Sequence, residues 1–343
     1  MKQAHAAPAR IRGFSLVELM VSLTIGLILM VAVVSAYLGS AGAGRMAEAQ
    51  GRMNEDAQAA LGILTQQIRM SGNNPKRANR TSFDSRNSVY VPTTTTTFAT
   101  TYFSARGCDG TFSNVTSAAT LDALTCVAGT TTLPDSIAVN YEADRYNTVP
   151  TSAGVPTDCL GQSLTGYDTT VVVSAGAGTG TGTATYYVAD NRFYITSTAA
   201  LTPSLYCKGN GGAAQPLVEN IEDLQFSYGT SPASTSTATV AGSSATVAGY
   251  LDAYGVETNA VNDTGGANLA GLVAGGGFTA SAKRWTRVMT VRICVLARSE
   301  GPVAPDAASA RYTRCDGTVE TNPPDLRLRR AYSTTVVLRN RMY

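Results

Sequence analysis

A chain of 343 residues can bury a sizeable core in one large or two modest domains. Charged residues make up only 15% of it and the formal net charge is +2, so the composition excludes a global positive field for nucleic acid. The only histidine is His5. If the first 13 residues are removed, no imidazole remains, which excludes Ser-His-Asp triads, Cys-His pairs and histidine-ligated metal sites. We therefore expect no enzymatic activity, no catalytic residue, no metal ion and no cofactor.

Residues 1–13 form a basic, alanine-rich leader, and an apolar segment follows at 14–38. Of these 25 residues, 19 are apolar, which is enough to cross a hydrocarbon core of roughly 30 Å. Lys2, Arg10 and Arg12 all precede the segment, and basic residues favour the cytoplasmic side of a membrane. The sequence therefore predicts a single transmembrane helix in the inner membrane, with a cytoplasmic N-terminus and an exported remainder.

A single carboxylate, Glu18, interrupts the apolar segment. The next charged residue is Arg45. An acid in this setting costs about 2.5–3.5 kcal/mol on membrane-insertion scales. A helix that only anchors a chain does not need such an acid, so Glu18 is the first candidate for a functional residue.

The helical pattern continues beyond the membrane segment, because no proline occurs between Pro8 and Pro75. Apolar residues recur at the spacing of an amphipathic helix, namely Met46, Met53, Ala57, Leu61, Leu64 and Ile68. The pattern ends at Ser71-Gly72, which is typical of a helix C-terminus. We expect one helix over 14–72, and the glycines at 39, 42 and 44 predict a bend or partial unwinding around 39–44.

Residues 73–343 form the predicted β-rich domain. Residues 73–133 read as an extended loop with one strand near Val89–Val91, and residues 229–282 read as a long surface excursion. Elsewhere the apolar period changes to two, which predicts strands at 136–141, 170–174, 184–189, 192–196, 224–228, 288–298 and 333–340. Asp190-Asn191 reads as a hairpin turn. The prediction is an α+β fold, with the long N-terminal helix packed on an antiparallel β-sheet domain that carries long loops.

Six cysteines all follow the apolar segment, on the side predicted to be exported. An even number of cysteines in that compartment favours disulfides, although six cysteines allow 15 pairings and buried free thiols are an alternative. Pairing of sequence neighbours gives Cys108–Cys126, Cys159–Cys207 and Cys294–Cys315.

The run Gly13-Phe14-Ser15-Leu16-Val17-Glu18-Leu19, ahead of an apolar helix, resembles the class III signal of type IV pilins and pseudopilins. This resemblance implies that a prepilin peptidase cleaves between Gly13 and Phe14 and methylates the new amine of Phe14. It also implies that Glu18 is the acid that sets the register between subunits. A free amine near Glu18 would supply the cation that a buried carboxylate needs.

Other segments are similar to the minor pilins called PilW and, to a lesser degree, to the J-type pseudopilins of type II secretion. They are Gly51–Glu55, Ile68–Gly72, Asn220–Gly229, Val288–Arg292 and Arg339–Arg341. Residues 73–215 and 229–284 carry no such resemblance, and Ser35 and the glycines from 39 onward stand where many major pilins have a proline.

The resemblance implies a structural subunit of the type IV pilus, in the minor-pilin complex that primes assembly and sits at the pilus tip. This role would support adhesion and twitching motility. The expected partners are the prepilin peptidase, other major and minor pilins, the inner-membrane assembly platform and a tip adhesin. The protein would lie in the inner membrane before assembly and in the fibre at the cell surface afterwards.

Several alternatives stay open on the sequence alone. A type II secretion pseudopilin shares the same N-terminal signal. A cleavable secretory signal could end at Ala41-Gly42-Ala43, but it would not explain Glu18 or the continuing helix. A membrane-anchored enzyme or binding module could use a calcium site of Asp252, Glu257 and Asp263, although loop acids are more often solvated. Nucleic-acid binding by Arg327, Arg329, Arg330, Arg339 and Arg341 is not expected, because no aromatic platform accompanies them.

Overall fold

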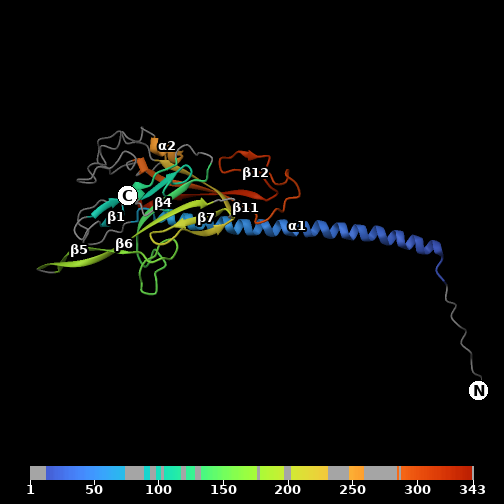
Figure 1. Cartoon of the computed structure of the whole chain (residues 1–343), viewed down its shortest axis with the longest axis horizontal. Coiled ribbons are helices and arrows are strands. Elements are labelled where there is room, and N and C mark those ends of the chain that lie inside the picture. Colours follow the sequence, from blue (N-terminus) through green and yellow to red (C-terminus); the bar gives the residue numbers. More distant parts are fainter. Residues whose placement is uncertain are drawn as a thin grey trace, which may run out of the picture.

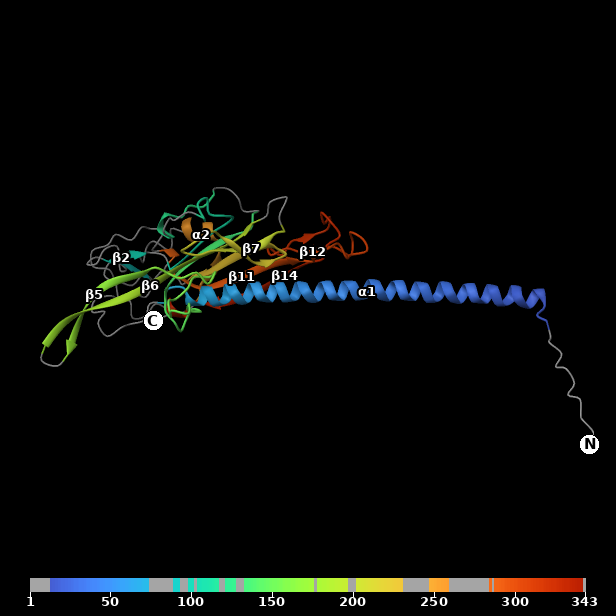
Figure 2. The ribbon, with the colours of Figure 1, turned by 60° about the horizontal axis from the view of Figure 1, so that its bottom comes forward.

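The computed structural model describes residues 13–73, 89–92, 98–101, 104–116, 121–127, 133–175, 178–196, 202–230, 247–258, 284–285 and 287–341. One long helix, α1 (Leu16–Met70), extends away from a β-rich domain, and only its C-terminal half packs against that domain (Figures 1 and 2). The predicted α+β architecture is confirmed.

Helix α1 is continuous over 55 residues. Ser15 caps its N-terminus, because the Ser15 hydroxyl accepts a hydrogen bond of 3.1 Å from the Glu18 N–H. Its last residue is Met70, and Gly72 follows with a φ of +72°, as the sequence pattern predicted. The partial unwinding expected at 39–44 is wrong, because α1 is helical throughout this segment, and the bend that was the other expectation stays a prediction. Each glycine costs about 1 kcal/mol relative to alanine, and that cost does not outweigh the main-chain hydrogen bonds that unwinding would break.

The C-terminal half of α1 buries one narrow stripe of side chains against the domain. The buried stripe consists of Met53, Ala57, Ala60, Leu64 and Ile68. Leu61, which the sequence pattern placed on this face, is only partly buried. The two alanines at the centre of the stripe are fully buried, and such small residues let a helix lie close to a sheet.

Two antiparallel sheets form the main body of the domain. The first has four strands in the order β10 (Gly249–Leu251), β9 (Ile221–Thr230), β11 (Val288–Arg298) and β14 (Arg329–Val337). The second has the order β3 (Ala105–Cys108), β4 (Ser136–Ala143), β6 (Gly178–Thr196), β7 (Ser204–Lys208) and β8 (Gln215–Glu219), with β5 (Gly166–Ala175) paired to β6. Two small pairs accompany them, β1 (Val89–Pro92) with β2 (Phe98–Thr101) and β12 (Tyr312–Thr313) with β13 (Val319–Glu320).

The chain passes from the second sheet to the first at a single residue, Asn220. This asparagine has a φ of +61°, a conformation that asparagine tolerates better than most residues with a side chain. Residues of α1 and of both sheets share the main hydrophobic core, and a smaller cluster of Tyr141, Ala143, Leu164 and Ala189 lies in the second sheet and the segment before β5.

The hairpin turn predicted at Asp190-Asn191 is wrong, because both residues lie inside the continuous strand β6. The Asp190 carboxylate is bonded to Arg192 on the same strand, at 2.9 and 3.0 Å. The Asn191 amide donates to Gln67 Oε1 at 2.8 Å and to the Tyr141 hydroxyl at 3.2 Å. These partners replace the local hydrogen bonds that make the two residue types favour turns.

The region 73–133 is also more ordered than its sequence suggests. It contributes β1, β2, β3 and a short 3-10 turn at Leu121–Ala123, and β3 pairs with β4 in the second sheet. Within the predicted excursion 229–282, the described part holds β10 and the short helix α2 (Ala253–Thr258), which buries Val256. The rest of that excursion lies outside the described residues.

Gly107 lies where no larger residue fits. Tyr228 and Trp285 are each 1% exposed and meet edge to face, with ring centroids 4.8 Å apart. A Cβ on Gly107 would lie 1.8 Å from the Tyr228 hydroxyl oxygen and 3.3 Å from the Trp285 ring. Glycine at this position of β3 is therefore required by packing.

Gly107→Ala should lower the free energy of unfolding by about 1–3 kcal/mol, because the added methyl group must displace Tyr228. Denaturant unfolding of the full chain in detergent measures this change. Gly62→Ala is the matched control, since a Cβ there meets nothing within 4 Å and alanine stabilises a helix by up to about 1 kcal/mol over glycine. Equal stability of Gly107→Ala and the unmodified chain would contradict this packing.

Candidate processing and assembly site

The predicted cleavage point lies in a short non-helical segment ahead of α1. Residues 13–15 have no helical assignment, and α1 begins at Leu16. Phe14 is 84% exposed, and a Cβ on Gly13 would meet no atom within 4 Å. The Gly13–Phe14 bond is therefore sterically open to a processing enzyme.

Glu18 lies in the first turn of α1, four residues after Phe14 in the sequence. Its neighbours on the helix are apolar and exposed, including Leu16, Val17 and Leu19. The next basic residue of the helix is Arg45, about 40 Å away at 1.5 Å per residue. The helix itself therefore offers no cation to this carboxylate, and a partner must come from another amine or another chain.

The first half of α1 makes no contact that shields it from solvent. The large apolar side chains from Phe14 to Leu38 are all exposed. By length and composition α1 can cross a membrane, and it is the single such helix among the described residues. A surface of this kind needs lipid or other helices around it.

Two family models match the chain. One, described as Type IV Pilus-assembly protein W, covers residues 185–340, and the prokaryotic N-terminal methylation motif covers residues 8–34. The chain is a PilW-type minor pilin. Its N-terminal apolar helix anchors it in the membrane, and it is incorporated into the type IV pilus. Comparison with curated proteins and with solved structures gave no match.

The PilW match begins inside β6 and includes β7 to β14. It therefore covers the four-stranded sheet and the strand β8 that α1 contacts, whereas β4, which α1 also contacts, lies outside it. The methylation-motif match contains Gly13, Phe14 and Glu18. The domain before residue 185, including β3, β4 and β5, lies outside both matches.

Three disulfides join the six cysteines of this PilW-type pilin in the same pairs that sequence neighbours suggest. Their Cα atoms are 5.5 Å apart in Cys108–Cys126, 6.5 Å in Cys159–Cys207 and 5.7 Å in Cys294–Cys315. These separations are ordinary for disulfides. Each bond ties a connecting segment to a strand, namely β3, β7 or β11.

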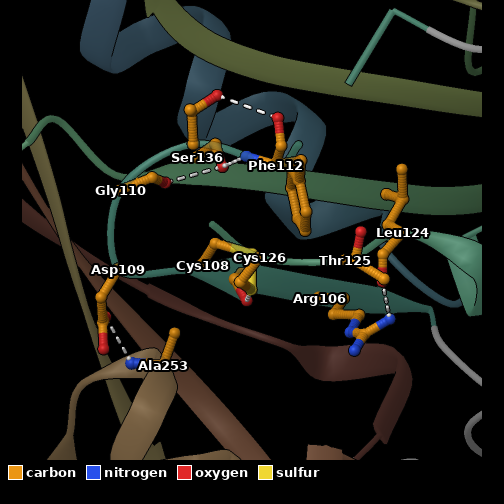
Figure 3. The surroundings of a disulfide bond; sticks show 12 residues. Arg106, Cys108, Asp109, Gly110, Phe112, Leu124, Thr125, Cys126, Ser136 and Ala253 are labelled. Atoms are coloured by element: carbon orange, nitrogen blue, oxygen red, sulfur yellow. Dashed lines mark hydrogen bonds between the residues drawn. A yellow bond between two sulfur atoms is a disulfide. The ribbon is translucent and has the colours of Figure 1, made fainter. Parts of the chain in front are cut away.

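The surroundings of Cys108–Cys126 illustrate how loops are fixed to this domain (Figure 3). Beside the disulfide, Arg106 donates to the Leu124 carbonyl at 2.5 Å, and Asp109 accepts from the main-chain N–H groups of Ala253 and Tyr254 at 2.8 and 2.7 Å. Asp109 thereby attaches the start of α2 to the loop after β3.

The two described candidate calcium ligands, Asp252 and Glu257, are each bonded to other groups of the domain. Asp252 accepts from the Gly255 N–H at 2.6 Å, whereas Glu257 pairs with Arg106 at 3.3 Å and accepts from the Trp285 indole at 2.8 Å. Asp263 lies outside the described residues. No group of three or more histidine, cysteine or acidic side chains within the described ranges has a metal-binding arrangement.

The C-terminal arginines do not form one free basic stripe either. The Arg329 guanidinium is buried and pairs with Glu222 at 2.5 Å and Asp325 at 2.7 Å. Arg327 pairs with Asp325 at 3.4 Å, while Arg330 is exposed. Two of the five arginines are thus used inside the domain.

Asp135 is a buried aspartate whose pKa is raised, and residues with strongly shifted pKa values are candidates for acid–base chemistry. Its Oδ1 accepts from the Gly110 N–H at 3.1 Å and its Oδ2 from the Phe226 N–H at 2.8 Å. Burial raises the pKa of Asp135 to about 8, and the two N–H groups lower it by a smaller amount. Because both oxygens are used to join the loop after β3 to β9, the geometry indicates a structural role.

Asp135 should make the stability of the domain depend on pH. An aspartate in an unfolded chain titrates near 3.9, so between about pH 4 and 8 the folded chain keeps a proton that the unfolded chain releases. The free energy of unfolding should therefore fall as pH rises through this range, by at most about 1.4 kcal/mol per pH unit.

Urea unfolding at several pH values between about 4 and 8 measures this dependence, and Asp135→Asn should flatten it. Asp306→Asn is the control, because hydrogen bonds from Ser309 lower the pKa of exposed Asp306 and it titrates below the range. A steep profile that persists in Asp135→Asn would assign the dependence to another group.

Proposed function

We propose that this minor pilin belongs to the complex that primes pilus assembly and sits at the tip of the fibre, where it supports adhesion and twitching motility. The observation that carries the proposal is the exposed apolar half of α1 with one uncompensated acid, Glu18, in its first turn. Around that half of α1, contacts with lipid can be replaced by contacts with the helices of neighbouring subunits. The acid then requires a cation from the assembly.

Processing would create this cation. Cleavage between Gly13 and Phe14 by the prepilin peptidase converts an amide nitrogen into an α-amine, which the same enzyme methylates without removing its basicity. The amine of Phe14, or that of an adjacent subunit, can then pair with Glu18 in a low-dielectric environment. An incorrect axial register would leave both charges unpaired, which is costly in the apolar fibre core.

The orientation follows from the leader. Lys2, Arg10 and Arg12 hold the N-terminus in the cytoplasm, so the domain with its three disulfides faces the oxidising side of the membrane. The partners of this stage are the inner-membrane assembly platform and other major and minor pilins. A tip adhesin is the partner proposed for the finished fibre.

Deletion of the chain, followed by counting surface pili and assaying protein secretion, tests the function. Loss of pili with intact secretion is expected. Loss of secretion with normal pili would show instead that the chain is a type II secretion pseudopilin.

Glu18→Ala should leave membrane insertion intact and lower incorporation into pili, because the amine loses its partner. The measurement is the ratio of this chain in sheared pili to that in membranes, by quantitative immunoblotting. Glu48→Ala is the matched control, since Glu48 is an exposed acid on the same helix that pairs with Arg52. Normal incorporation of Glu18→Ala would refute the registration role.

Gly13→Val should block cleavage and hold the chain in the membrane.

A further inference from the structure

The strands β5 and β6 extend beyond the second sheet as a two-stranded ribbon. The ribbon consists of the paired residues 168–175 and 178–185, from the pair Asp168–Thr185 to the pair Ala175–Gly178. Strand β4 pairs with β6 only from Tyr187 onward, and β7 only from Arg192 onward. At about 3.3 Å per residue the ribbon is roughly 25 Å long.

The ribbon lies at the end of the domain opposite the free half of α1, as both overall views show (Figures 1 and 2). Because that half of α1 enters the membrane, the ribbon points away from the membrane. Among the described strands, β5 pairs only with β6. The outer edge of β5 therefore presents main-chain N–H and carbonyl groups that no described strand uses.

Apart from Asp168 at its base, the ribbon lacks the features that usually protect an open edge. From Thr169 to Ala189 there is neither a charged residue nor a proline, and the register of β5 on β6 shows no bulge. Natural proteins place lysine, proline or bulges on edges that must stay unpaired. A two-stranded hairpin alone is also only marginally stable in water, so a third strand would add stability.

The register of the ribbon pairs every second residue of β5 with a glycine of β6. Val171, Val173 and Ala175 pair with Gly182, Gly180 and Gly178. Glycine inside a strand often marks a place where another backbone approaches closely.

The composition restricts what can bind. Nucleic acid and anionic lipid need basic residues, which the run from Thr169 to Ala189 lacks. Base or sugar stacking needs aromatic rings, and none occurs between Thr169 and Thr185. What remains is the row of main-chain groups along β5, which is complementary to another extended polypeptide.

We propose that the outer edge of β5 binds an uncharged, extended strand of another pilin subunit, located on the side of this chain that faces away from the membrane. The added strand continues the sheet beyond β6 and β5 through main-chain hydrogen bonds. The inference rests on the proposed function, because a subunit on that side exists only in an assembled pilus or its priming complex.

In-cell photocrosslinking of the full chain tests the proposal. With p-benzoylphenylalanine in place of Ser174, mass spectrometry of isolated pili should find an adduct with a strand peptide of another protein that has a prepilin motif. Val172→Lys introduces a charge at the edge and should reduce this adduct about tenfold. The matched control is Val337→Lys, which places a lysine on the edge strand β14 and should leave the adduct unchanged. Intact disulfides on non-reducing gels verify folding of each variant.

The outcomes separate this contact from the proposed function. If the chain is present in pili but position 174 gives no such adduct, the contact is wrong and the function stands. An adduct with a second copy of this chain, a polysaccharide or a protein without a prepilin motif also overturns the contact, as does an equal loss in Val337→Lys. Absence of the chain from pili overturns the function and the contact together.

Discussion

The structure depends on α1, whose two halves lie in different environments. Apart from Glu18, the first half of α1 has no charged residue and exposes large apolar side chains, whereas the second half buries only the stripe from Met53 to Ile68. Because the stripe is narrow, the remaining faces of that half stay free for other subunits. Polar contacts join the domain to α1 at several positions along the helix. Arg52 forms an ion pair with Glu300 at 3.4 Å, and the Tyr332 hydroxyl donates to Asn54 Oδ1. The Asn340 amide donates to the Arg69 and Ser71 carbonyls, each at 3.2 Å.

The rest of the domain is organised to keep this contact in place. The middle of α1 lies on β11 and β14, and its C-terminal end lies against the second sheet. There the Gly72 N–H donates to the Asn140 carbonyl at 2.8 Å, and the Ser71 hydroxyl donates to the Ser104 carbonyl at 2.8 Å. Gln67 accepts from both Tyr141 and Asn191, which belong to β4 and β6. Both sheets are therefore fixed to the same helix, and the disulfides attach the connecting segments to strands of those sheets.

The sequence was informative where one physical signal dominated. The apolar segment, the spacing of Met53, Ala57, Leu64 and Ile68, and the glycine after Ser71 predicted α1 correctly, and the alternation in 288–298 predicted β11. The errors have a common cause, since the deciding interactions are distant in sequence. Asn191 is held in a strand by Gln67 and Tyr141, and the Asp190 N–H donates to Asn210 Oδ1. Strand β3 forms because β4 pairs with it, although its own residues have little strand preference. The role proposed for Glu18 would depend on a neighbouring chain, so it is suggested by the sequence only through the prepilin motif.

The direction of α1 along the domain also has a mechanical meaning. The helix runs beside β11 and β14 instead of meeting the domain end-on (Figure 2). A force that pulls on the membrane end of α1 therefore acts parallel to the buried stripe and loads all its contacts in shear at once. A peeling force would break them one at a time. The narrow contact that leaves most of the helix free for neighbours is thus oriented to resist tension along the axis of α1.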